Sequence, residues 1–248
     1  MIKPGQSTLA IELCDRTSDN RFSTLRMSTT PPNSETELLT RAQALAGLSL
    51  GELASAQHCA WPRSLKRAKG WIGELLELAL GATAGSRPEP DFPHLGVELK
   101  TLPVRNDGQP KESTFVCVLS LSDRIESRWE ESLVRRKLAR VLWVPVQYDP
   151  GIDPAQRRIG TPTLWSPTTE EEIMLRADWE ELTDMIREGQ LAAITARHGD
   201  WLQIRPKAAD GRALTSTVDP EAGRILTLPR GFYLRTRFTA RILKRQYA

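Results

Sequence analysis

The chain has 248 residues, of which 40% are hydrophobic and 26% are charged, and its formal net charge is +3 at pH 7. This composition is typical of a globular protein with one large domain or two small lobes. No run of about 18 apolar residues is present, which excludes a membrane span. The N-terminus lacks the apolar core of a signal peptide. The three cysteines and three histidines have no metal-ligand spacing, so we expect reduced thiols, no zinc site and a cytoplasmic protein.

The chain begins with a segment that has no regular hydrophobic pattern. Residues 1–33 are rich in Ser, Thr, Asn and Pro without a sustained hydrophobic period, which predicts a disordered leader. The folded part is then expected over residues 34–248. Ser34 is a candidate N-cap, and Glu37 three residues later completes a capping box for the first helix. A second short helix is expected from Ser49.

The segment Leu65–Leu80 starts with basic residues and continues as a predicted helix. Its apolar face includes Trp71, Leu75 and Leu78. Glu77 stands inside this apolar pattern, and ionised carboxylates are rarely buried without a partner or a metal. Two interpretations of Glu77 follow. It is an ordinary surface residue, or it is a third acid near a metal ion if this helix packs against the next strand.

The segment Pro90–Lys100 has the spacing of a metal-dependent nuclease site. Alternating apolar and polar residues predict a strand on which Glu98 and Lys100 share one face, while the apolar residues point into the core. A turn can bring Asp91 back beside Glu98, and two converging carboxylates suit Mg²⁺. A lysine beside such an ion can orient water or stabilise charge on a phosphate. The alternative is a solvated strand face with a weak Glu–Lys pair.

Further segments are expected to extend this sheet. Thr114–Leu121 predicts a second strand of the same sheet, and Arg140–Val146 predicts a third whose proline favours an edge or a bulge. Arg128–Leu138 has helical character with an exposed basic end. Lys137 precedes the third strand, where a lysine is within reach of a phosphate near the site. Arg157–Trp165 is a candidate fourth strand.

The last third of the chain is basic and follows an acidic helix. Residues 170–188 are dominated by Glu and Asp and predict an amphipathic helix. Its apolar residues are Ile173, Leu175, Trp179, Leu182 and Ile186. From Arg197 onwards eleven Lys and Arg stand against four acids, and the chain closes on a basic helix around residues 238–246. This distribution supports two interpretations equally, a polyanion-binding face and a solubilising surface.

Long segments in a fixed order carry a resemblance to a known family. They are Lys69–Gly73, Leu75–Glu77, Asp91–Thr101, Thr114–Val118, Val134–Lys137, Arg140–Trp143, Thr195–Gly199, Gln203–Ala209 and Leu226–Leu234. In these segments the chain resembles the MutH family of DNA mismatch repair endonucleases, from about Pro31 to the C-terminus. Pro90 and Asp91 with Glu98-x-Lys100 also match the PD-(D/E)xK signature of restriction-endonuclease-like nucleases.

The resemblance implies a fold and a reaction. The fold is mixed α/β, restriction-endonuclease-like, with a central mixed β-sheet flanked by helices. An N-terminal catalytic lobe and a C-terminal DNA-reading lobe form a DNA-binding cleft. The reaction is Mg²⁺-dependent nicking of the unmethylated strand at hemimethylated GATC sites, on the 5′ side of the G. The partners are double-stranded DNA and MutL, which is loaded by mismatch-bound MutS. A monomer in the bacterial cytoplasm, nucleoid-associated when active, is implied.

The resemblance also assigns roles to individual residues. Asp91 and Glu98 match the metal ligands, and Leu99 adds its backbone carbonyl. Lys100 matches the catalytic lysine, and Glu77 matches an additional acid from the neighbouring helix. The residues matched to DNA contacts are Lys69 and Lys137 near the backbone and active site, Arg205, Pro206 and Lys207 in a loop that reads the site, and Tyr233, which senses the adenine N6-methyl group.

Other interpretations of these residues remain open. Tyr233 beside Phe232 is alternatively a core tyrosine, and Arg205 with Lys207 alternatively binds phosphate without sequence choice. The acidic helix from Glu170 is a candidate MutL surface by charge alone. Two rival functions also remain, a methylation-sensitive type II restriction-like endonuclease that cuts both strands and a catalytically silent DNA-binding protein.

Overall fold

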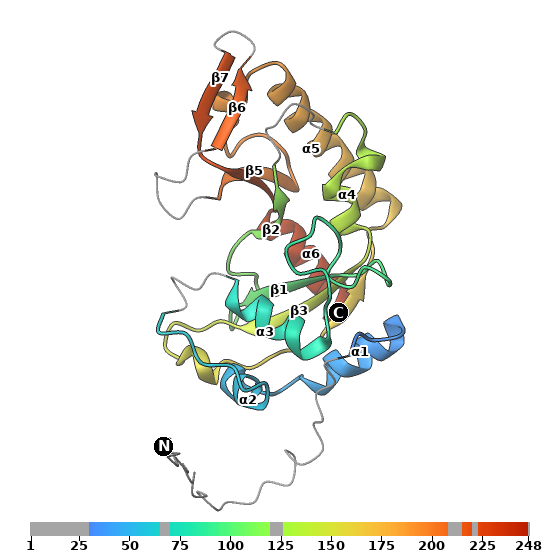
Figure 1. Cartoon of the computed structure of the whole chain (residues 1–248), viewed down its shortest axis with the longest axis vertical. Coiled ribbons are helices and arrows are strands. Elements are labelled where there is room, and N and C mark those ends of the chain that lie inside the picture. The colour runs from blue at the N-terminus through green and yellow to red at the C-terminus, as the bar shows by residue number, and fades with distance from the viewer. Residues whose placement is uncertain (1–29, 65–69, 120–125, 208–214, 220–222, 248) are drawn as a thin grey trace, which may run out of the picture.

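The chain folds as the mixed α/β protein that the sequence predicts (Figure 1). The computed structural model describes residues 30–64, 70–119, 126–207, 215–219 and 223–247, so most of the predicted leader lies outside the described residues. The helices are α1 (Glu35–Ala44), α2 (Leu50–Ala56), α3 (Trp71–Leu80), α4 (Leu133–Leu138), α5 (Thr169–Arg187) and α6 (Thr236–Tyr247). The strands are β1 (Glu98–Val104), β2 (Thr114–Val118), β3 (Val141–Gln147), β4 (Thr163–Trp165), β5 (Leu202–Pro206), β6 (Thr215–Asp219), β7 (Gly223–Thr227) and β8 (Arg230–Leu234). None of the helices in these ranges is long and apolar enough to cross a bilayer.

The strands of the described residues form three sheets, with orders β1-β3-β4, β2-β8-β5 and β6-β7. β1 and β3 are parallel, β3 and β4 antiparallel, and β2 and β5 both pair antiparallel with β8. The prediction that the strand from Thr114 joins the sheet of β1 is therefore wrong. Its alternating pattern identifies a strand but does not identify the pairing partner, which lies more than 100 residues further along the chain.

The proline of β3 does not mark an edge strand, because β3 is the central strand of its sheet. β4 pairs only with Val141–Trp143 and has ended before Pro145 is reached. The loop at Gly160 lies beside Pro145, and the Gly160 N–H donates to the Pro145 carbonyl at 2.8 Å. The missing proline N–H therefore interrupts no strand pairing on that side. The predicted fourth strand is confirmed only for Thr163–Trp165.

Two hydrophobic cores cover opposite faces of the β1-β3-β4 sheet. One core joins α1, α2 and α3 to Leu99, Leu142 and Val144, and the other joins α4, α5, α6 and the β2-β8-β5 sheet to Leu102 and Trp143. Residues 141–146 of β3 are all buried, as expected for a strand covered on both faces. The sheet that carries Glu98 and Lys100 is therefore held rigidly from both sides.

The helix starts follow the predicted caps with one difference. The Ser34 side chain accepts the Glu37 N–H at 3.1 Å, but the Glu37 carboxylate returns to the N–H of Asn33 at 2.8 Å. Ser49 and Glu52 complete the reciprocal capping box of α2. Gly81 follows the C-terminal end of α3 and has φ +79°. A Cβ at this position would lie 2.5 Å from the Thr30 carbonyl oxygen. Glycine thus lets the segment before α1 pack against the end of α3.

Some side chains that the helical patterns place inside the protein are exposed. Leu78 is 45% exposed and Ile173 is 63% exposed, so neither belongs to the buried face of its helix. Conversely, the segment Val134–Lys137 is exposed only in part: Arg136 is exposed, but Val134 is buried and the Lys137 side chain is only 12% exposed. The hydrophobic period identifies a helix but does not fix which neighbour covers each turn.

Acidic and basic segments near the C-terminus neutralise each other. Glu170 accepts from Arg241 at 2.7 Å, and the buried Glu171 lies 3.3 Å from Arg245. Glu172 pairs with Arg135 at 2.7 Å. The charge of α6 is therefore partly directed at α5, and the start of α5 carries little unpaired charge with which to attract a partner. A polyanion-binding face must depend on basic residues elsewhere.

A buried carboxylate anchors the start of β5. Asp178 of α5 is 7% exposed and accepts three backbone N–H groups, those of Asp200 at 2.8 Å, Trp201 at 2.6 Å and Leu202 at 2.8 Å. We expect Asp178→Ala to lower the free energy of unfolding by about 3 kcal/mol, because charge-assisted hydrogen bonds are lost and their donors stay buried. Urea denaturation measures this. Asp184→Ala, on the exposed side of the same helix, is the control, and an equal loss in both variants would contradict the prediction.

Candidate active site

The turn before β1 places two carboxylates side by side. Phe92 and Val97 bond to each other through their backbones at 2.9 and 3.3 Å, which folds the intervening residues back. Asp91 consequently lies beside β1, and its Oδ2 accepts the Leu99 N–H at 2.7 Å. Asp91 is 8% exposed and Glu98 is 2% exposed. The predicted return of Asp91 to the strand is confirmed.

Two lysines hold the Glu98 carboxylate from both sides. Lys100 Nζ lies 2.5 Å from Glu98 Oε1, as their shared strand face predicts. Lys137 Nζ donates to Glu98 Oε2 at 2.8 Å and to the Glu89 carbonyl at 2.5 Å, and lies 3.9 Å from Asp91 Oδ1. Lys137 reaches this point because parallel β1 and β3 begin at the same edge, where the Glu98 N–H donates to the Arg140 carbonyl at 2.9 Å.

Glu77 belongs to the electrostatic surroundings of this cluster. It lies on α3, which packs against β1. Burial, followed by repulsion from Asp91 and Glu98, raises the pKa of Glu77 from 4.5 to about 7, and Lys100 opposes this rise. Burial and the negative charge of Glu98 likewise raise the pKa of Asp91. Glu77 therefore lies within electrostatic reach of Asp91 and Glu98, and repulsion among the three acids is only partly offset by Lys100.

The donor set fits a divalent cation. Asp91 and Glu98 already direct oxygens at one positive group, the Lys137 ammonium, and both are oxygen ligands of the kind that Mg²⁺ prefers. In the described residues no three His, Cys, Asp or Glu side chains are gathered closely enough to form a complete ligand set. The fit is therefore to an ion held by two carboxylates and completed by backbone, water or substrate oxygens, as is usual for Mg²⁺.

The raised pKa of Glu77 predicts a pH-dependent stability. A carboxyl group whose pKa is higher in the folded state destabilises that state as pH rises from 4.5 to about 7. In EDTA, Glu77→Gln should therefore raise Tm by about 2–4 °C at pH values above 7, a solvent-screened effect on the order of 1 kcal/mol, and change it little below pH 4.5. Glu74→Gln on the exposed side of α3 is the control. A Tm difference that does not vary with pH would contradict the prediction.

A second group of residues lies on the β2-β8-β5 sheet. Arg205 and Pro206 are the last two residues of β5, and Lys207 follows directly, so the predicted loop is largely the end of a strand. Arg205 lies 5.8 Å from the centre of the Tyr233 ring and donates to Ser113 Oγ at 2.5 Å. The structure thus brings the predicted DNA-contacting residues of β5 and β8 together. Lys69 lies outside the described residues.

Phe115 is part of this group and was not predicted as a functional residue. Its ring meets the Tyr233 ring edge-on at 5.3 Å, and Lys207 Nζ lies 4.2 Å from its centre. A Cβ on Gly231 would lie 2.8 Å from the Phe115 ring, so only glycine permits this packing. The sequence signal is present in the alternation of β2, where Phe115 is half-buried between the buried Thr114 and Val116. Tyr233 is half-buried, with burial raising its pKa, so it is not a core tyrosine.

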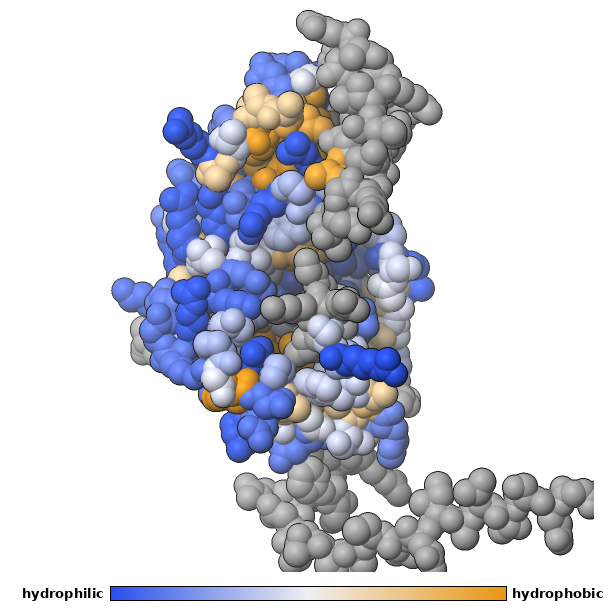
Figure 2. Space-filling view, turned by 90° about the vertical axis from the view of Figure 1, so that its left-hand side faces the viewer, coloured by the Kyte–Doolittle hydropathy of each residue, from blue (hydrophilic) through white to orange (hydrophobic). Residues whose placement is uncertain are grey.

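The two groups of residues adjoin each other. Burial lowers the pKa of Lys207, and the positive charge of Lys100 adds to this effect. Cys117 of β2 is buried near both groups, and burial raises the pKa of its thiol to about 12, although the positive charge of Lys100 opposes this rise. Figure 2 shows that the face turned toward its viewer is largely hydrophilic, with hydrophobic surface gathered mainly in the upper half. The acid–lysine cluster and the basic aromatic surface therefore lie within electrostatic reach of each other.

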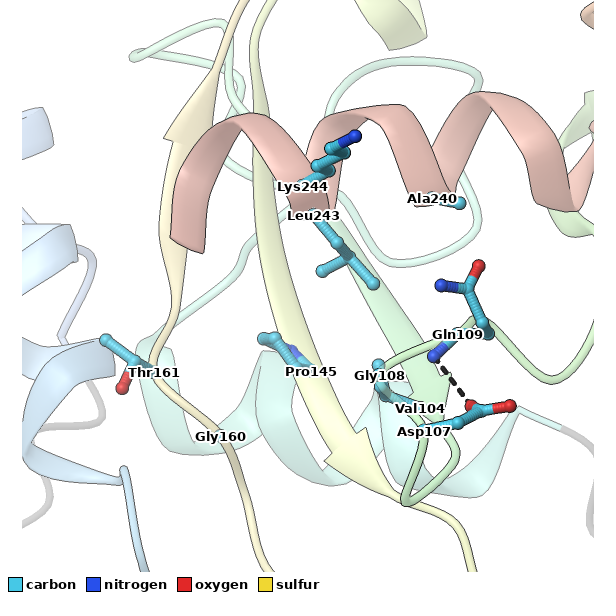
Figure 3. A pocket seen from close by; sticks show the side chains of 10 residues that line it. All are labelled: Val104, Asp107, Gly108, Gln109, Pro145, Gly160, Thr161, Ala240, Leu243 and Lys244. Atoms are coloured by element: carbon cyan, nitrogen blue, oxygen red, sulfur yellow. Dashed lines mark hydrogen bonds between the residues drawn. The ribbon is translucent and has the colours of Figure 1, made fainter. Parts of the chain in front are cut away.

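A cavity of about 550 Å³ lies elsewhere, between α6 and the β1-β3-β4 sheet (Figure 3). Pro145 of β3 and Leu243 of α6 border it, and the turn at Gly108 closes one side. Its charged lining residues are Asp107 and Lys244, and none of the acids or lysines described above contributes to it. The candidate active site is therefore the acid–lysine cluster, where two carboxylates and two lysines converge.

Comparison with known proteins identifies the family of the chain. The family model described as DNA mismatch repair enzyme MutH matches residues 80–178, which include Asp91, Glu98, Lys100 and Lys137. The DNA mismatch repair protein MutH of Escherichia coli O6:K15:H31 is 57% identical over 217 residues, and that of Serratia proteamaculans is 58% identical. Each alignment covers 88% of this chain and 95% of the relative. The chain therefore belongs to the MutH family of DNA mismatch repair endonucleases.

Proposed function

We propose that this protein nicks the unmethylated strand of hemimethylated GATC sites, on the 5′ side of the G, in a Mg²⁺-dependent reaction activated by MutL. The observation that supports this best is the junction of two groups of residues. Asp91, Glu98, Lys100 and Lys137 converge at one point, and a surface carrying Arg205 and Tyr233 adjoins them. The first group suits phosphodiester hydrolysis, and the second suits recognition of bases.

The acid–lysine cluster suggests how the bond is cut. Asp91 and Glu98, with the backbone carbonyl of Leu99, would hold Mg²⁺, which would supply positive charge to the phosphate as negative charge develops. Lys100 is fixed by Glu98 on the same strand face, where its ammonium can orient the attacking water and stabilise the transition state. Lys137 keeps the Glu98 carboxylate in place from the opposite side. Glu77 adds negative charge that favours cation binding.

The β2-β8-β5 sheet suggests how the site is chosen. Arg205 presents a guanidinium already oriented by Ser113, and arginine contacts guanine through two hydrogen bonds in the major groove. Pro206 and Lys207 extend this contact surface. Tyr233 lies under Arg205 with its ring fixed by Phe115, which suits a residue that is sensitive to one methyl group on adenine N6. Generic phosphate binding would not require such fixed aromatic contacts.

The partners and setting follow from the same role. We propose that the protein acts as a monomer, because cutting one strand needs one catalytic centre. We further propose that MutL, loaded by MutS at a mismatch, stimulates it in the bacterial cytoplasm, at the nucleoid. The MutL surface is not assigned to the start of α5, because the acids there are paired with arginines.

One assay separates this function from its rivals. The protein and Mg²⁺ are incubated with hemimethylated, unmethylated and fully methylated GATC duplexes, with and without MutL and ATP. The expected result is nicking of the unmethylated strand, stimulated by MutL, with no cleavage of the fully methylated duplex. Efficient double-strand cutting without MutL would instead identify a methylation-sensitive restriction enzyme. Binding without cleavage, unchanged by Lys100→Ala, would identify a silent DNA-binding protein.

A further inference from the structure

A second, strongly basic cavity lies at the edge of the β2-β8-β5 sheet. Its volume is about 500 Å³, and Lys111, Arg205, Arg235 and Arg237 line it together with Ser113 and Gln203. Glu112 is the one acidic side chain among its lining residues, all of which the structure describes. Four cationic side chains and neutral hydrogen-bonding groups therefore line this cavity together with one carboxylate.

The arginines of this cavity are only partly used by the fold. Arg235 donates through Nη2 to the carbonyls of Ala196 and His198, both at 2.8 Å, but its buried Nε has no partner. Arg237 donates through Nε to the Asp200 carbonyl and through Nη2 to the Asp200 carboxylate at 2.6 Å. These bonds fix both guanidiniums in position and leave donor capacity in each, since a guanidinium has five N–H groups.

The local electrostatics are unfavourable without an anion. Burial lowers the pKa of Arg235, and the charges of Arg237 and Arg205 lower it further, although Asp178 and Asp200 oppose this. Both Arg235 and Arg237 also lie at the N-terminus of α6, whose first turn contains no acid. A helix N-terminus carries partial positive charge and unpaired N–H groups, so cations are disfavoured there and anions are favoured. Arginines at a helix N-terminus oppose this preference, and residues that oppose a local preference of this kind occur mainly at functional sites.

The cavity lies at the end of the sheet away from Lys207. Gln203, near the start of β5, lines it, whereas Lys207 follows the end of that strand, about 13 Å away at the rise of an extended chain. Lys207 adjoins the acid–lysine cluster, and Arg205 lies between the two ends. A duplex that is cut at Lys100 and read by Arg205 therefore continues toward this cavity.

We propose that the cavity of Lys111, Arg235 and Arg237 binds a backbone phosphodiester of the DNA that flanks the recognised bases, on the side away from the cleaved bond, and so fixes the register of the duplex. This assignment rests on the DNA substrate proposed above. It adds a phosphate contact that carries no sequence information of its own but positions Arg205 over its base.

The test uses the full chain, a fluorescent GATC duplex and Ca²⁺ in place of Mg²⁺, with the dissociation constant measured by anisotropy over a range of KCl concentrations. Arg237→Gln should weaken binding about 5–10-fold near physiological salt and reduce the slope of log Kd against log salt by about 0.9, the value for one phosphate. Lys111→Gln is the second variant, in case Arg237→Gln unfolds the protein. The matched control is Arg128→Gln, since Arg128 is 66% exposed and, among the residues that the structure describes, pairs with Glu130 and Glu131 of its own turn.

Duplexes with a single uncharged methylphosphonate then locate the contact. One flanking position should weaken binding of the wild type but not of Arg237→Gln. The proposal is overturned if both cavity variants bind DNA with the same affinity and salt dependence as Arg128→Gln. It is also overturned if no methylphosphonate position weakens binding while inorganic phosphate protects the wild type against thermal unfolding, because the cavity would then bind free phosphate rather than DNA. Wild-type nicking of a hemimethylated form of the same duplex, measured in Mg²⁺ with MutL and ATP, keeps the two questions apart. Its absence would refute the proposed function, whereas its presence with normal cavity variants would refute only this inference.

Discussion

Lys100→Met is expected to reduce the rate of strand nicking by about 10²–10³-fold, the range found when one group that stabilises transition-state charge is removed. The methionine keeps the aliphatic stem that packs along β1 and removes only the ammonium beside Glu98. Because Lys100 is 12% exposed and lies on the same strand face as Glu98, we expect its ammonium to act on the reacting phosphate rather than on distant DNA. The affinity for DNA should therefore change much less than the rate.

Single-turnover nicking of a hemimethylated duplex measures the effect, with the dissociation constant determined separately in Ca²⁺. Lys244→Met, at an exposed position on α6, makes the same chemical change away from the site and should leave both quantities unchanged. A rate loss that is matched by an equal loss of affinity would show that Lys100 only binds the DNA backbone. A wild-type rate in Lys100→Met would remove it from the mechanism altogether.

The part of the site that the sequence predicts correctly is local in the chain. Asp91, Glu98 and Lys100 lie within ten residues, so strand periodicity and one turn suffice to place them together. The contact of Lys137 with Glu98 depends on the parallel register of β1 and β3, which is set some 40 residues away. Hydrophobic alternation does not encode that register. The same limit explains why β2 was placed in the wrong sheet.

Charge patterning predicts even less, because it does not reveal which charges are paired. The basic C-terminal third contains two kinds of arginine. Arg241 and Arg245 face the acids at the start of α5, whereas Arg235 and Arg237 lie at a cavity and keep donors free. Both kinds of arginine add the same positive charge when charged residues are counted along the sequence. Only the packing of α6 shows that the second kind is available to an anion.

Arg205→Ala is expected to reduce kcat/KM on GATC duplexes by about 5–150-fold, which corresponds to the 1–3 kcal/mol of discrimination that a two-hydrogen-bond contact to guanine provides. Arg205→Lys should lose most of the same activity, because an ammonium cannot reproduce the planar fork of a guanidinium. The Arg205 guanidinium is held between Ser113 Oγ and the Tyr233 ring, so it enters the complex already oriented. Its loss should therefore affect selection among sequences more than overall affinity.

The measurement compares kcat/KM on GATC with that on duplexes in which the G·C pairs of the site are exchanged. In the wild type the ratio is expected to be large, and in both Arg205 variants it should fall toward one, because the correct sequence loses its advantage while the altered sequences lose little. Ser113→Ala, which removes only the group that orients Arg205, should give an intermediate ratio. If Arg205→Ala weakens cleavage of all sequences equally, Arg205 contacts phosphate, and base recognition must then be sought in Pro206, Lys207 and Tyr233.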